Sequence, residues 1–120
     1  MKMDYVKMDK FENTLQVWFY IEQDRIMAIG DQMEKINVNA YMNGYNWEAF
    51  LDYYLSKYAP DVSENMGHDP EAGMYVAYYP LSSENELKAE KFVKLIQNLI
   101  ENEEEIYRIV REEGSEIEWD

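Results

Sequence analysis

Length, composition and charge exclude several classes of protein. The chain has 120 residues, of which 47% are hydrophobic, and it has no cysteine and a formal net charge of −14. This apolar content is too high for a disordered chain, so we expect one domain spanning residues 1–120. Without cysteine there are no disulfides or thiolate metal sites, which fits a cytoplasmic protein.

The acidic charge is concentrated in the second half of the chain. Residues 61–120 contain 16 acidic and 5 basic residues, whereas residues 1–60 contain 9 acidic and 6 basic residues. Such a surface lacks the cations that contact phosphates, so nucleic acid and anionic membranes are poor partners and a basic protein is a better one. No secretion signal or membrane span is expected, because no apolar run approaches about 18 residues.

An N-terminal hairpin is the first predicted element. Residues 5–11 and 15–21 alternate between apolar and polar side chains, and Glu12 and Asn13 between them form the expected turn. The odd-numbered positions of the second strand are predicted to point into the core.

Helical spacing follows in residues 25–38. Ile26, Ile29 and Met33 recur every three or four residues, which is typical of one buried helix face. Gly30 interrupts this pattern and predicts a short or interrupted helix, because glycine is a poor helix former.

The strongest helical pattern lies in residues 47–58. Six apolar or aromatic residues recur there at i, i+3, i+4, i+7, i+8 and i+11. Asn46 is the predicted N-cap, and Pro60 lies beyond the end. Trp47 begins the aromatic inner face and is expected in the core.

A strand is predicted for residues 74–79, after a turn at Asp69 and Pro70. Its side chains alternate, with Tyr78 expected in the core. Pro80 stops the strand, since proline lacks the N–H that a sheet requires.

Two helices and a short strand are predicted for the rest of the chain. Ser83 and Glu86 form a capping box before the first helix, whose apolar stripe includes Leu87. The second helix ends near Gly114. Residues 116–119 alternate and predict an edge strand.

These elements predict an α+β fold. A small antiparallel sheet is expected from the N-terminal hairpin and the strand near residues 73–79. Three to four helices are expected to pack against one face of this sheet.

The sequence contains no candidate catalytic, cofactor-binding or metal-binding set. His68 is the only histidine, and one imidazole beside carboxylates is a weak basis for a metal site or an activated nucleophile. We interpret it as a loop residue. The five glycines are isolated, so no phosphate-binding glycine loop is present.

Two groups of outward-facing side chains are candidate contacts with a partner. The acidic group lies outside the apolar stripe of the C-terminal helices and serves solubility, electrostatic docking or both. The aromatic group consists of strand tyrosines, because tyrosine brings a large contact area at low entropic cost. The candidates are Glu101, Glu103, Glu104, Glu105, Glu112 and Glu113 in the acidic group, and Tyr20, Tyr75 and Tyr79 in the aromatic group.

Two segments carry a family resemblance, namely NGYNW at residues 43–47 and DPEAGMYVAYY at residues 69–79. At this separation, and followed by two helices, they resemble family fifty-one of the bacterial immunity proteins that accompany polymorphic toxins and contact-dependent growth inhibition. The resemblance implies a small cytoplasmic protein that binds and neutralises the C-terminal domain of a cognate toxin, without catalysis. That toxin domain is expected to be basic. We interpret as structural the motif residues Asn43, Gly44, Tyr45, Trp47, Asp69, Pro70, Glu71, Gly73 and Tyr78.

Two other functions stay open at the level of the sequence. One is a small ligand-binding domain or enzyme that uses a pocket lined by carboxylates and tyrosines, and the other is a generic adaptor domain. The lack of a nucleophile, a base and an orienting group argues against the enzyme.

Overall fold

Four antiparallel strands form one sheet in the computed structural model, which describes residues 5–120. The strands are β1 Val6–Phe11, β2 Thr14–Phe19, β3 Gly67–His68 and β4 Tyr75–Pro80, and their order in the sheet is β1-β2-β4-β3. The predicted hairpin and the central strand are confirmed as neighbours. The short edge strand β3 was not predicted from the sequence.

The predicted hairpin turn at Glu12 and Asn13 is confirmed by the pairing of Phe11 with Thr14 on either side of it. Glu12 has a φ angle of 55°. A residue with a Cβ atom in this left-handed region costs about 1 kcal/mol, so the strand pairing holds the turn against a local penalty.

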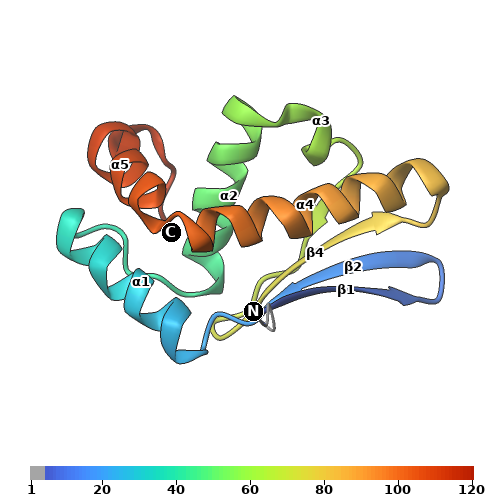
Figure 1. Cartoon of the computed structure of the whole chain (residues 1–120), viewed down its shortest axis with the longest axis horizontal. Coiled ribbons are helices and arrows are strands. Elements are labelled where there is room, and N and C mark those ends of the chain that lie inside the picture. Colours follow the sequence, from blue (N-terminus) through green and yellow to red (C-terminus); the bar gives the residue numbers. More distant parts are fainter. Residues whose placement is uncertain (1–4) are drawn as a thin grey trace.

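Helices cover one face of the sheet, which confirms the α+β class. Their bounds are α1 Asp24–Ile36, α2 Gly44–Tyr58, α3 Pro60–Ser63, α4 Ser83–Glu101 and α5 Glu103–Glu113, followed by a 3₁₀ helix, η1, at Gly114–Glu116. Residues 5–120 therefore contain five α-helices instead of the expected three to four, and α1 is continuous through Gly30. Figure 1 shows α4 lying along the sheet, whereas α1 and α5 lie together beyond one end of it.

Aromatic contacts join the sheet to two helices. Phe19 of β2 packs edge-on against Trp47 of α2, with ring centroids 5.0 Å apart. Tyr75 of β4 packs in the same way against Phe92 of α4, at 6.2 Å. All four side chains are buried, which confirms the core position predicted for Trp47.

The two faces of β4 are the reverse of the prediction. Tyr75 and Tyr79, expected on the outside, are fully buried, whereas Tyr78, expected in the core, is 40% exposed. The pairing register is the reason, because Tyr75 lies opposite Phe19 and Tyr79 opposite Leu15, on the face that the helices cover. Tyr75 and Tyr79 are therefore core residues and are not available to a partner.

Both long helices begin with a different cap from the predicted one. The N-cap of α2 is Asn43, whose side chain accepts from the Asn46 N–H at 2.9 Å. The N-cap of α4 is Ser82, which accepts from the Asn85 N–H at 3.0 Å, so Ser83 is the first helical residue. In both helices the N-cap residue has an extended backbone, and its side-chain oxygen accepts from the N–H of the residue three positions later in the chain.

Two further predictions are wrong. Leu87 is 63% exposed, because the buried face of α4 near its start passes through Lys88 and Ala89 instead. Residues 116–119 form no strand, since they follow η1 away from the sheet and pair with none of its described strands.

Candidate functional site

Ion pairs occupy four of the six acidic residues predicted to contact a partner, namely Glu101, Glu105, Glu112 and Glu113. Glu101 at the end of α4 accepts from the Arg25 guanidinium at 2.8 Å. On α5, Arg108 bonds Glu105 at 2.7 Å and Glu112 at 3.4 Å, and its guanidinium holds the pKa of Glu105 below its ordinary value. The spacing of three and four residues is a signal of this pairing that the sequence already contains.

Glu113 is buried, although the sequence predicts it on the outer face. Its carboxylate accepts from the Tyr53 hydroxyl at 2.6 Å, the Lys57 ammonium at 2.7 Å and the Tyr58 hydroxyl at 2.8 Å. The Arg108 guanidinium adds a contact at 3.1 Å. These donors, with Lys57 first, lower the pKa of Glu113 to about 2. Three donors of α2 surround the Glu113 carboxylate and shield it from solvent. Glu113 therefore links the last turn of α5 to α2.

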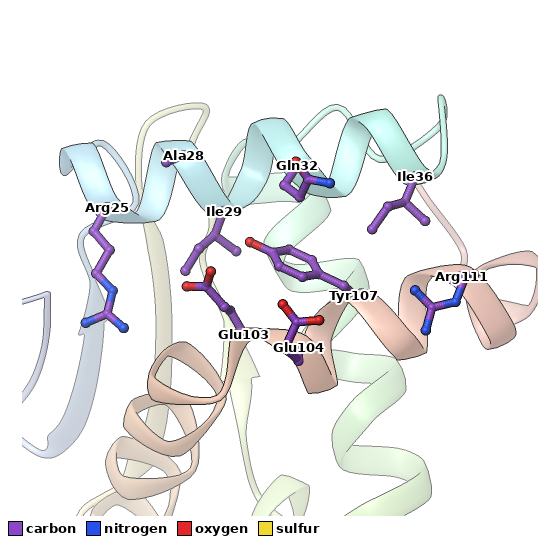
Figure 2. A pocket seen from close by; sticks show the side chains of 9 residues that line it. All are labelled: Arg25, Ala28, Ile29, Gln32, Ile36, Glu103, Glu104, Tyr107 and Arg111. Atoms are coloured by element: carbon purple, nitrogen blue, oxygen red, sulfur yellow. The ribbon is translucent and has the colours of Figure 1, made fainter.

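A groove of about 560 Å³ lies between α1 and α5. Figure 2 shows that apolar side chains of α1 form one wall and that the side chains of α5 rise from the other helix. Its lining residues are Arg25, Ala28, Ile29, Gln32, Ile36, Glu103, Glu104, Tyr107 and Arg111. Glu103 and Glu104, the remaining two predicted acidic contacts, form no ion pair with any residue in 5–120 and lie in this groove.

Tyr107 lies in the α1–α5 groove with its hydroxyl unpaired. The residue is 8% exposed, and the hydroxyl forms no hydrogen bond with any residue in the described part of the chain. Burial first, and then the carboxylates of Glu103 and Glu104, raise the pKa of Tyr107 to about 12, so the hydroxyl keeps its proton at neutral pH. Sequence analysis missed this residue because only the approach of α1 distinguishes it from its buried neighbours on α5.

A second groove, of about 440 Å³, lies between α2 and the C-terminal segment. Carboxylates dominate its lining and no basic side chain takes part: the lining residues are Tyr45, Glu48, Ala49, Asp52, Tyr53, Ser56, Glu116, Glu118 and Asp120. Its two tyrosine hydroxyls are satisfied in other ways, since Tyr53 donates to Glu113 and Tyr45 is 42% exposed to solvent.

His68 lies in β3 rather than in the loop expected for it. Its Nδ1 lies 2.8 Å from the Tyr75 hydroxyl, and its Nε2 lies 3.9 Å from an Asp52 carboxylate oxygen. The imidazole is thus held between a core tyrosine and α2. In residues 5–120, no group of three or more histidine and acidic side chains is arranged to hold a metal ion, and no helix is long and apolar enough to cross a membrane.

The two motif segments, residues 43–47 and 69–79, contact each other at Gly44. Its N–H donates to the Ala72 carbonyl at 3.1 Å. A Cβ atom at Gly44 would overlap the carbonyl oxygen of Glu71. Close approach, and not backbone conformation, therefore requires glycine here, because no glycine in residues 5–120 has a positive φ angle.

The chain reversal in the second motif segment lies later than the turn predicted at residues 69–70. Glu71 and Met74 exchange two backbone hydrogen bonds, at 2.8 and 3.3 Å, so Gly73 lies within the turn. A Cβ atom at Gly73 would approach the Glu22 carboxylate to 2.9 Å. The tight turn places its carbonyl groups against the start of α2.

Both motif segments lie within the region of the chain that matches a known family. The chain matches the family described as Immunity protein 51 over residues 7–115, a region that contains both motif segments and all residues of the α1–α5 groove. Comparisons with curated proteins and with solved structures found no match. Because the match covers nearly all of the 120 residues, the chain belongs to the Immunity protein 51 family.

Proposed function

We propose that this protein is an immunity protein that binds the C-terminal domain of a cognate bacterial toxin in the cytoplasm and neutralises it. The family match over residues 7–115 is the observation that carries the proposal, since the family name implies a toxin as partner. Inhibition is by binding, without any reaction catalysed by the immunity protein.

Charge supports a partner with a basic surface. The net charge of −14 is concentrated in the second half of the chain, where Glu103 and Glu104 have no ion-pair partner in residues 5–120. A toxin domain that acts on nucleic acid presents cations at its cleft, and a negative field accelerates encounter with such a surface.

The sole imidazole supports binding over catalysis. His68 is held against the Tyr75 hydroxyl, and the fully buried Tyr75 has its pKa raised well above the ordinary value by burial. A base fixed on a core side chain is poorly placed to activate a nucleophile.

Co-expression with the toxin domain encoded by the neighbouring gene tests the proposal. Cells that produce the toxin domain alone should stop growing, and cells that also produce this protein should grow. The purified proteins should form a complex whose association rate falls about tenfold or more as sodium chloride rises from roughly 50 to 300 mM. Growth arrest that co-expression does not relieve would refute the proposed function, whereas a salt-independent association rate would refute only the electrostatic part.

A further inference from the structure

The Tyr107 side chain is buried, but its hydroxyl reaches the solvent in the α1–α5 groove and has no partner in residues 5–120. Tyr107 is more than nine-tenths buried, yet no residue in 5–120 bonds its hydroxyl. The hydroxyl is therefore free to bond a group that enters the groove, while the buried ring fixes its position. In Figure 2 the Tyr107 ring lies between the two helices, and its hydroxyl points toward the end of the groove where Ile29 and Glu103 lie.

The carboxylates beside this hydroxyl are also unpaired. Glu103 is half-buried and Glu104 is exposed, both line the groove, and neither has an ion-pair partner in the described part of the chain. Of the two arginines in the lining, Arg25 is held by Glu101 at 2.8 Å, and Arg111 is 60% exposed with Glu112 at 3.9 Å. Neither arginine therefore forms an ion pair with Glu103 or Glu104, whose carboxylates stay free to bind a cation.

The walls of the groove fit the stem of a long side chain. Ala28, Ile29 and Ile36 of α1 supply apolar surface to the groove. In Figure 2 Ile29 lies beside Glu103, whereas Ile36 lies at the Arg111 end. Lysine and arginine combine an apolar stem with a head that only donates hydrogen bonds. The Tyr107 oxygen and the carboxylates of Glu103 and Glu104 can all accept hydrogen bonds from such a head. The Tyr107 O–H can at the same time donate to a carbonyl group of the partner.

We propose that the α1–α5 groove receives a lysine or arginine side chain of the toxin domain, with its stem on Ile29 and its head bound by Glu103, Glu104 and the Tyr107 hydroxyl. The inference rests on the proposed function and names the part of the surface that performs it. The second groove has more carboxylates, but Tyr53 donates to Glu113 and Tyr45 is 42% exposed, so no buried side chain there presents an unpaired polar group.

Titration calorimetry and stopped-flow binding with the toxin domain of the neighbouring gene test this assignment. Tyr107→Phe keeps the ring and removes only the hydroxyl, and it should weaken the complex about tenfold, mainly through faster dissociation. Because that hydroxyl has no partner in the free protein, the melting temperature of Tyr107→Phe should be unchanged or higher. Tyr78→Phe makes the same change on the outer face of β4 and should bind like the wild type.

Removal of the two carboxylates provides a second test that leaves the core intact. Glu103→Gln combined with Glu104→Gln should weaken binding about thirtyfold or more. Glu90→Gln, an exposed residue of α4, is the matched control. Wild-type affinity in both groove variants would overturn the inference while the proposed function stands. A loss confined to Glu48→Gln and Glu118→Gln would overturn it in favour of the second groove, and a toxin that does not bind the wild type would overturn both proposals.

Discussion

Replacing Gly44 with alanine tests the contact between the two motif segments. Gly44 is the first residue of α2, and its N–H donates to the Ala72 carbonyl at 3.1 Å. An added Cβ atom would overlap the Glu71 and Met74 carbonyl oxygens and would lie 2.9 Å from the Glu71 carbonyl carbon. These atoms belong to the backbone of a tight turn, so no rotamer change relieves the overlap.

The cost follows from two contributions. Pushing the turn away from α2 by roughly 1 Å or more costs about 2 kcal/mol, within the range for overpacked sites. The movement also breaks the Gly44–Ala72 hydrogen bond, which contributes about 1 kcal/mol. A loss of about 3 kcal/mol in the free energy of unfolding is expected. With an unfolding entropy of about 0.25 kcal/mol/K for a chain of 120 residues, the melting temperature should fall by about 12 °C.

Calorimetry or circular dichroism measures this shift, and Gly30→Ala is the matched control. Gly30 lies inside α1, where a Cβ atom would meet the Met42 Cβ atom at 3.0 Å, so Met42 must shift by a few tenths of an ångström but no carbonyl group is overlapped. The higher helix propensity of alanine offsets this tight contact, so its melting temperature should stay within about 3 °C of the wild type. If Gly44→Ala also stays within that range, the close approach of the two motif segments is refuted.

Two further predictions concern Glu113 and Glu12. Glu113→Gln should lower the free energy of unfolding by about 2 kcal/mol in urea titrations, less than the roughly 3–5 kcal/mol of a fully buried pair, because Lys57 is 46% exposed and can be rehydrated. The pKa of Glu113 is about 2 in the folded protein and 4.5 ordinarily, so its contribution to stability is complete above about pH 5 and is lost as the pH falls through 2. Glu113→Gln should therefore lose less stability than the wild type over this interval. An acid-unfolding curve identical to that of the wild type would contradict the assigned role. Glu12→Gly should raise the free energy of unfolding by up to about 1 kcal/mol, because glycine adopts the φ angle of 55° without a steric penalty. An equal gain in Glu12→Ala would show that the loss of charge, and not the backbone conformation, is responsible.

Periodicity in the sequence was sufficient for the elements with one apolar face. The odd-numbered residues of β2 are buried as predicted, and so are Trp47, Phe50, Leu51 and Leu55 of the α2 stripe. Tyr58, at the end of the same stripe, was predicted to face inward and is 42% exposed. The same reasoning identified the hairpin turn and the α+β class. Helix starts were shifted, since Asn43 and Asn46 are both suitable caps and only the path of the chain selects one.

Tertiary structure decided the outcome wherever the local pattern allowed two answers. Both faces of β4 are apolar and aromatic, so only its register against β2 determines that Tyr75 and Tyr79 are buried and Tyr78 is exposed. Glu113 resembles the other glutamates of its run, and only α2 supplies the donors that bury it. The α1–α5 groove requires two helices that are distant in sequence, and Tyr107 acquires its unpaired hydroxyl from their packing. Composition and periodicity report what each segment prefers by itself, whereas burial and pairing depend on which segments meet.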